Sequence, residues 1–282
     1  MAAVVAVVTD STACLPAGLA ARCGITVVPL RIVAAGLAAD DDPAAFSGVL
    51  GGKELGGGAR LSTASPAPER FAAAYAAAAK AGAGAVLSVH VSASLSGTVN
   101  SAALAASAAP VPVRVVDSRS LGMGLGFAAL AAAEAATAGA GLDAVAGAAI
   151  DRARALGSFF VLDTLDELRA GGRLPPERPA AGARLTARPL LHLADGRVAV
   201  LEKLRTPSAA VRRLEEVAAE FAGGRPVDVA VQYLGPPERG EALARRLEQL
   251  IPCARHRYLT EAGPVIRAHT GPGMLGAVVA PY

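Results

Sequence analysis

The chain has 282 residues, of which 53% are hydrophobic and 4% aromatic, with 27 basic side chains against 24 acidic ones. This composition excludes an intrinsically disordered protein, and the length favours two domains of ordinary size over one large domain. A net charge of +3 is too small to indicate nucleic-acid binding, so we expect no nucleic-acid partner.

Mean hydropathy is high, at +0.43, but alanine accounts for most of it. The longest apolar region, Phe127 to Ile150, is interrupted by charged residues, threonine and glycines, so no run of about 18 to 20 apolar residues is available to span a bilayer. The start, Met1 to Val8, has no basic n-region and resembles a first strand rather than a signal peptide. We expect a cytoplasmic protein without stable membrane insertion, making at most transient membrane contact.

The first half alternates strand-like and helix-like segments. Short valine-rich runs predict strands at Val4 to Thr9, Ile25 to Val33, Ala85 to Val91 and Val113 to Asp117. Alanine-rich segments predict helices at Pro16 to Arg22, Pro66 to Ala81, Ser96 to Ala108, Gly124 to Ala138 and Leu142 to Leu156. This alternation predicts a mostly parallel, Rossmann-like sheet with helices on both faces.

The second half has a different pattern. Ala187 to Leu193 and Arg197 to Leu204 flank Ala194-Asp195-Gly196, which predicts a hairpin. Helices are expected at Pro207 to Phe221 and Pro236 to Leu250, strands at Val227 to Tyr233 and His256 to Thr260, and a closing segment at Gly263 to Val279. We therefore expect an α+β domain with a mixed sheet over residues 158–282, after an α/β domain over 1–157, with Asp163 to Leu174 as a connector. Gly51 to Gly58 and Leu174 to Pro179 are expected to be loops.

The spacing of the cysteines and the distribution of charge indicate less about function than the pattern of strands and helices indicates about fold. Cys14, Cys23 and Cys253 have no metal-binding or disulfide spacing, so reduced thiols and no metal site are expected. Arg152 to Arg213 holds 12 basic and 6 acidic side chains, a local charge of +6. This segment is either a face for an acidic or phosphate-bearing partner or an ordinary solvated surface.

Several motifs carry hydroxyl or basic groups. Polar residues end three expected strands, at Thr9-Asp10, His90 and Asp117, and ligands of open α/β sheets bind at such strand ends. Ser62 to Pro68 and His90 to Thr98 place hydroxyls before expected helices, where they serve either as helix caps or as donors to a carboxylate or phosphate. Further polar groups occur at Gly171-Gly172-Arg173, at Lys203 with Arg205, and at His269-Thr270 within a Gly/Pro-rich turn.

Taken in chain order, these segments resemble the DegV family of bacterial fatty-acid-binding proteins. The similarity lies in VVTDSTACLPAGLAARCGITVVPLRIV, LSTASPAP, SVHVSASLSGTVNSA, VRVVDSRSLGMGLG, LDTLDELRAGGRL, LEKLRT and GPVIRAHTGPGMLG, which together cover nearly the whole chain. The resemblance implies a two-domain fold that buries a long-chain fatty acid between its domains. It also implies a separate kinase, related to dihydroxyacetone kinases, that phosphorylates the carboxylate using its own ATP and Mg²⁺.

The resemblance also implies roles for individual residues. Thr63, Ser94, His269 and Thr270 would bind the carboxylate, with Ser92 and Ser96 as further head-group contacts, while Arg173, Lys203 and Arg205 would lie at the head-group entrance or dock the kinase. No catalytic residue, cofactor or metal is implied, and a monomer is expected.

Three residues depart from the family pattern. Ala64 and Ser65 replace Ser and Gln, and Ala93 replaces a serine, so head-group hydrogen bonding is expected to be rearranged.

Two other functions stay open from the residues alone. The first is a small-molecule phosphotransferase or serine-type hydrolase using the Ser92 to Ser96 loop with His269, although the chain has no Walker A loop and no nucleophile elbow. The second is a DNA-binding regulator, supported only by the basic segment.

Overall fold

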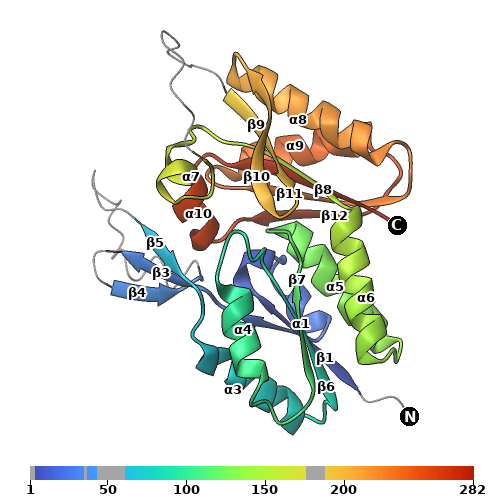
Figure 1. Cartoon of the computed structure of the whole chain (residues 1–282). Helices are drawn as coiled ribbons and strands as arrows, with labels where there is room; N and C mark the ends of the chain where they lie inside the picture. The colour runs from blue at the N-terminus through green and yellow to red at the C-terminus, as the bar shows by residue number, and fades with distance from the viewer. Residues whose placement is uncertain (1–3, 35–36, 43–60, 176–187) are drawn as a thin grey trace. The chain divides into compact units, whose positions relative to one another are not determined.

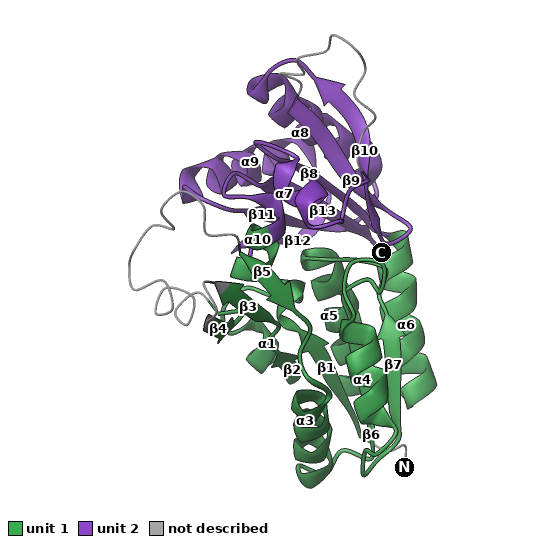
Figure 2. Ribbon diagram, turned by 60° about the vertical axis from the view of Figure 1, so that its left-hand side comes forward, with its two compact units in different colours: residues 1–155, 263–268 green, residues 156–262, 269–282 purple. Residues whose placement is uncertain are grey.

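A computed structural model describes residues 4–34, 37–42, 61–175 and 188–282 of the chain. The chain divides into unit 1, residues 1–155 and 263–268, and unit 2, residues 156–262 and 269–282 (Figure 2). The predicted loop at Gly51 to Gly58 lies outside the described residues, as do Ala187 and residues 176–179. The predicted boundary between two domains after residue 157 stays a prediction.

Unit 1 is built on a parallel four-stranded sheet, as predicted. Its strands are β1 (Val5–Asp10), β2 (Ile25–Val28), β6 (Ala85–His90) and β7 (Val113–Asp117), in the order β2-β1-β6-β7. Helices α3 (Pro68–Lys80) and α4 (Thr98–Ala106) cover one face, and α5 (Met123–Thr137) and α6 (Leu142–Ala155) cover the other (Figure 1). Neighbouring residues of β1 divide between the two cores because successive strand side chains point to opposite faces: Val8 packs with α3 and Val7 with α5.

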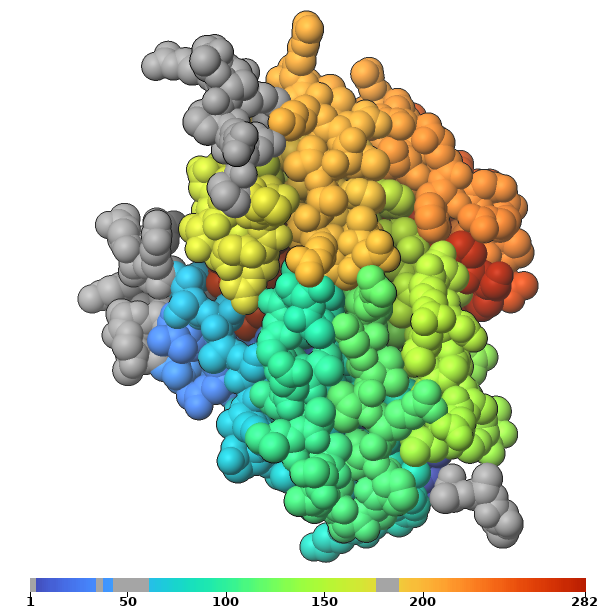
Figure 3. Space-filling view, in the orientation of Figure 1, coloured from blue at the N-terminus to red at the C-terminus, as the bar shows by residue number. Residues whose placement is uncertain are grey.

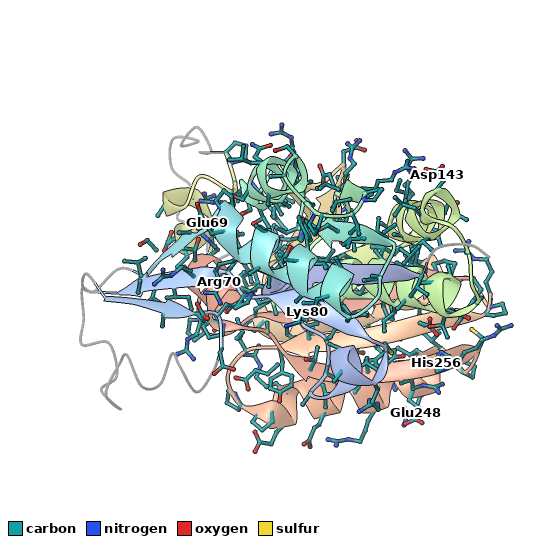
Figure 4. The ribbon with its side chains drawn as sticks, turned by 90° about the horizontal axis from the view of Figure 1, so that it is seen from below. Glu69, Arg70, Lys80, Asp143, Glu248 and His256 are labelled. Atoms are coloured by element: carbon teal, nitrogen blue, oxygen red, sulfur yellow. The ribbon has the colours of Figure 1, made fainter. Side chains whose placement is uncertain are left out.

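Helix α3 shows why these residues form this element. Pro68 occupies the first turn, where its missing N–H costs nothing, and Glu69 and Lys80 lie near the helix ends whose partial charges they complement (Figure 4). Phe71 and Tyr75, four residues apart, are both fully buried against the sheet.

The predicted strand Ile25 to Val33 is wrong as a single element. Pro29, which cannot donate a backbone hydrogen bond, separates β2 from β3 (Arg31–Ala34), and the N–H of Leu30 donates to Ser11 Oγ at 3.0 Å. Strand β3 instead pairs antiparallel with β4 (Leu37–Asp40) and β5 (Ser62–Ala64) in a separate three-stranded sheet that the sequence analysis did not predict.

The predicted helix Pro16 to Arg22 is shorter than expected. Only α1 (Leu19–Arg22) is helical there, and a 3-10 helix, η1 (Ser11–Ala13), precedes it. Cys14 ends η1 in the left-handed backbone region, at φ 48°, and Gly18 has φ 73° before α1. These two residues with positive φ interrupt the helical conformation, so the helix after β1 begins only at Leu19.

Unit 2 contains a mixed six-stranded sheet in the order β10-β9-β8-β13-β11-β12. The bounds are β8 (Gly157–Val161), β9 (Arg188–Ala194), β10 (Arg197–Leu204), β11 (Val227–Tyr233), β12 (Ala254–Glu261) and β13 (Leu275–Pro281). Strands β11 and β12 are parallel, and every other neighbouring pair is antiparallel. Helices α8 (Pro207–Ala222) and α9 (Pro237–Leu250) pack on one face, and α7 (Asp166–Ala170) follows β8.

The hairpin β9–β10 confirms the prediction made from Asp195-Gly196. Both residues have positive φ, 50° and 78°, which matches the handedness that two-residue hairpin turns require. Strands β8 and β13 were not predicted, because each is a short apolar run beside another apolar segment. Strand β13 lies in the middle of the sheet, between β8 and β11, so the last strand of the chain completes the core of unit 2.

Candidate functional site

The strand order of the parallel sheet locates the candidate site. From β1 the chain continues to β2 on one side, whereas β6 lies on the other side and leads outward to β7. Open α/β sheets bind ligands at the carboxyl ends of strands where the order reverses in this way. The reversal lies between β1 and β6, which end at Asp10 and His90.

Asp10 organises this end of the sheet. Its fully buried carboxylate accepts hydrogen bonds from the N–H of Thr12 at 3.0 Å, Thr12 Oγ1 at 2.5 Å and the N–H of Val91 at 2.9 Å. His90 Nδ1 lies 3.0 Å from Asp10 Oδ2. One carboxylate thus fixes both the chain leaving β1 and the chain leaving β6.

The network continues away from the strand ends into the core. His90 Nε2 lies 2.6 Å from Ser88 Oγ, which lies 2.8 Å from Tyr75 Oη on α3. Burial raises the pKa of the Tyr75 hydroxyl. Asp10, His90 and Ser88 follow the order of a serine-hydrolase triad, but Ser88 is fully buried and faces Tyr75. Its hydroxyl is therefore placed to stabilise the core rather than to attack a substrate.

The loop between β6 and α4, residues 91–97, holds the predicted serines, and we call it the hydroxyl loop. Ser92 Oγ accepts from the N–H of Ser94 at 3.2 Å, and Ser96 Oγ lies 2.9 Å from Thr98 Oγ1. Ser92 and Thr98 are buried, Ser96 is half-buried and Ser94 is exposed. The loop therefore presents hydroxyls from a buried base to an exposed tip.

Strand β5 brings a second hydroxyl segment to this loop. Ser65 Oγ lies 3.2 Å from Ser96 Oγ, and a Cβ on Gly97 would approach Ser65 Oγ to 3.3 Å. Thr63 lies two residues earlier, paired with Ile32 of β3. Ser65, one of the departures from the family pattern, thus contacts the predicted head-group residue Ser96, although Ser65 itself was given no site role from the sequence.

A second buried carboxylate, Asp41, joins the two ends of unit 1. Its Oδ2 accepts from Ser11 Oγ at 2.7 Å and its Oδ1 from the N–H of Val265 at 2.8 Å, near the start of α10 (Pro264–Thr270). Burial raises the pKa of Asp41 above its ordinary value. A Cβ on Gly263 would lie only 2.9 Å from Asp41 Oδ1. The missing side chain of Gly263 therefore lets Asp41 reach this helix.

His269 and Thr270, at the end of α10, belong to unit 2. A Cβ on Gly171 would lie 2.8 Å from His269 Nδ1, so the imidazole packs closely on the loop after α7. Burial and the nearby charge of Arg173 lower the pKa of His269 to about 4. His269 is therefore neutral at pH 7 and can donate a single N–H. The Arg173 guanidinium also donates to the carbonyl of Gly171 at 2.5 Å.

The carboxylates of Asp163 and Glu167 lie close to the glycine-containing turn that follows Thr270, residues 271–273. A Cβ on Gly273 would overlap the Asp163 carboxylate, and one on Gly271, where φ is 73°, would lie 3.5 Å from Glu167. These two glycines allow the turn to pack against both carboxylates. The turn was predicted from the sequence, but Asp163 and Glu167 were not predicted as its neighbours.

Lys203 and Arg205 lie at the end of β10, and both are exposed. In Figure 3 the hairpin and α8, gold to orange, form much of the visible surface of unit 2. Nearby Arg213 forms ion pairs with Glu202, Glu216 and Glu220, at 2.8, 3.2 and 2.9 Å. Part of the local positive charge is thus neutralised within the surface.

In the described part of the chain, no group of three or more His, Cys, Asp or Glu side chains is placed to hold a metal ion. Over the same residues, no helix is both long and apolar enough to cross a bilayer. The three cysteines are reduced thiols.

A parallel sheet ending in hydroxyl-rich loops, joined in one chain to a mixed six-stranded sheet, defines a two-unit α/β protein with a polar candidate binding site. The model of a family described as "Uncharacterised protein, DegV family" matches residues 4–282. A DegV domain-containing protein of Streptomyces coelicolor is 48% identical over 275 residues, which are 98% of each chain. The chain belongs to the DegV family.

Solved structures agree over the full length. A fatty-acid-binding DegV family protein of Thermus thermophilus is 33% identical, with a TM-score of 0.86 and 99% of each chain covered. DegV of Bacillus subtilis, described as a fatty acid binding protein, is 28% identical, with a TM-score of 0.88 and 100% of each chain covered. Both the fold class and the family resemblance drawn from the sequence are confirmed.

Proposed function

We propose that this protein binds a long-chain fatty acid and presents the carboxylate to a separate ATP-dependent kinase for acyl-phosphate formation. The observation that carries the first part is the run of hydroxyls Ser65, Ser96 and Thr98 at the carboxyl edge of the parallel sheet, in a fold shared over its full length with fatty-acid-binding relatives.

Burial of the acyl tail would dominate the affinity. Each buried CH₂ contributes about 0.8 kcal/mol, so a tail of about sixteen carbons supplies on the order of 12 kcal/mol before the costs of association. With 4% aromatic residues, the lining would be mainly aliphatic. Tail length and unsaturation would then be selected by the shape of that lining.

The carboxylate needs donors that compensate its lost hydration. We assign this role to Thr63 and Ser94, with Ser92 and Ser96 as further contacts, and to His269 and Thr270 of unit 2. The hydroxyls and the neutral imidazole donate hydrogen bonds without forming an ion pair, which would leave the carboxylate oxygen nucleophilic toward a phosphoryl group.

The kinase part of the proposal is based on three basic residues. Arg173, Lys203 and Arg205 are assigned to kinase docking or to the head-group entrance, because guanidinium and ammonium groups attract an acidic or phosphate-bearing surface. Lys203 and Arg205 are exposed, and Arg173 is half-buried. ATP and Mg²⁺ would be bound by the kinase, which would be related to dihydroxyacetone kinases.

Calorimetric titration of the purified, delipidated protein with palmitic acid tests the binding step. We expect one site of micromolar or tighter affinity. The Ser96→Ala variant should bind at least about threefold more weakly, because a hydrogen bond to a charged group contributes more than a neutral one. Failure of the wild-type protein to bind palmitic acid or any other long-chain fatty acid would contradict the proposal.

A further inference from the structure

The loop between β7 and α5 contains a buried hydroxyl whose surroundings do not explain it. Ser120 is 2% exposed, and its Oγ has no hydrogen-bond partner among the described residues. The backbone of Ser120 is fully used: its N–H donates to Ser118 Oγ at 3.1 Å, and its carbonyl accepts from the N–H of Ser92 at 2.9 Å. Only the side-chain oxygen is left unpaired.

Other buried hydroxyls of the same sheet are paired. Thr9 Oγ1 donates to the carbonyl of Val89 at 2.9 Å, and Ser88 lies between His90 and Tyr75. Burying a hydroxyl without a partner costs free energy that alanine at the same position would not cost. The serine at position 120 therefore points to a bonding partner from outside the folded chain.

The position of Ser120 indicates what that partner is. The hydrogen bond from Ser92 joins Ser120 directly to the hydroxyl loop. Two residues later Gly122, with φ 62°, caps the 15-residue helix α5 without a side-chain hydrogen bond. A Cβ on Gly126 would lie 2.8 Å from the carbonyl of Ala13, so the first turns of α5 pack against η1 after β1. An uncapped helix start at the edge where the strands end favours an anion.

We propose that Ser120 is a further ligand-binding residue, whose hydroxyl donates a hydrogen bond to the carboxylate of the bound fatty acid beside Ser92. This inference rests on the proposed function, which supplies the ligand. The hydroxyl would then be unpaired only in the ligand-free protein, and binding would satisfy it.

Three proteins test the inference: wild type, Ser120→Ala and, as a matched control, Ser118→Ala. Urea unfolding of the ligand-free proteins should show Ser120→Ala at least as stable as wild type. Ser118→Ala should be less stable, because Ser118 Oγ accepts from the N–H of Ser120 and donates to its carbonyl at 3.4 Å. A loss of stability in Ser120→Ala as large as in Ser118→Ala would show that Ser120 has a partner within the protein, and would overturn the inference.

Titration with palmitic acid and with hexadecanol gives the second readout. Ser120→Ala should bind palmitic acid about tenfold more weakly than wild type and hexadecanol nearly as well as wild type, because only the acid carries the carboxylate. Unchanged binding of the acid, or equal losses for acid and alcohol, would overturn the role of Ser120 and leave the proposed function standing. If wild type binds no fatty acid, both fail together.

Discussion

Nδ1 of His90 lies 3.0 Å from Oδ2 of Asp10 although 80 residues separate them, and both side chains are fully buried. The same carboxylate holds the N–H of Val91, the residue that begins the hydroxyl loop. The loop proposed to bind the head group therefore starts from a fixed point in the core rather than from a free strand end. This arrangement limits how far the serines can move when a ligand arrives.

Asp10→Ala should destabilise the protein strongly. The change leaves the N–H groups of Thr12 and Val91 without their acceptor in a buried environment, and we expect a loss of about 3 kcal/mol or more in the free energy of unfolding. Asp143→Ala is the control, because Asp143 (Figure 4) pairs with Arg114 and surface pairs contribute little. Similar urea midpoints for the two variants would contradict the role given to Asp10.

Gly263→Ala should destabilise unit 1. The new methyl group would lie 2.9 Å from Asp41 Oδ1, and Asp41 cannot move away without losing Ser11 or Val265. Thermal unfolding should show a clearly lower Tm. Gly147→Ala in α6 is the matched control: a Cβ there meets nothing within 4 Å, and alanine is the better helix former by about 1 kcal/mol. A Tm for Gly263→Ala at or above wild type would show that the contact is not tight.

His269 should make stability depend on pH. Its pKa is about 4 in the folded protein against the ordinary 6.5, so between these values the folded state binds fewer protons than the unfolded state. The free energy of unfolding therefore falls as the pH falls through this window. His269→Gln should reduce the difference in stability between pH 7 and pH 5 by about 1 to 2 kcal/mol. Thr270→Val, which changes no titratable group, should keep the wild-type difference, and identical differences in all three proteins would contradict the expected titration.

Arg205→Ala should separate ligand binding from phosphorylation. Affinity for palmitic acid should stay within about twofold of wild type, while the rate of kinase-dependent acyl-phosphate formation should fall about tenfold. Arg197→Ala, an exposed arginine at the other end of β10, serves as the control and should change neither. Equal losses of binding and phosphorylation in Arg205→Ala would place Arg205 in the ligand site instead.

The sequence predicted the features that depend on local pattern. Valine-rich runs and alanine-rich helices predicted the parallel sheet, and Asp195-Gly196 predicted the β9–β10 hairpin. Polar residues at the ends of β1 and β6 indicated the edge where Asp10 and His90 meet. The roles of Thr63, Ser94, His269 and Thr270 stay predictions.

Other features depend on contacts between residues distant in sequence. Nothing local to Asp41 indicates that it caps a helix 224 residues later. Likewise, Ser88 and Tyr75 look like ordinary strand and helix residues until the fold places their hydroxyls 2.8 Å apart. The three-stranded sheet was missed because β5 has only three residues, two of them hydroxylic, and resembles a loop.

Native mass spectrometry of the protein purified from its own cells, followed by lipid extraction, shows whether the protein binds a long-chain fatty acid. We expect a bound species with the mass of a long-chain fatty acid, close to one per protein chain, that is lost after delipidation and restored by added palmitic acid. A protein that carries no lipid and fails to take up any added long-chain fatty acid would contradict it.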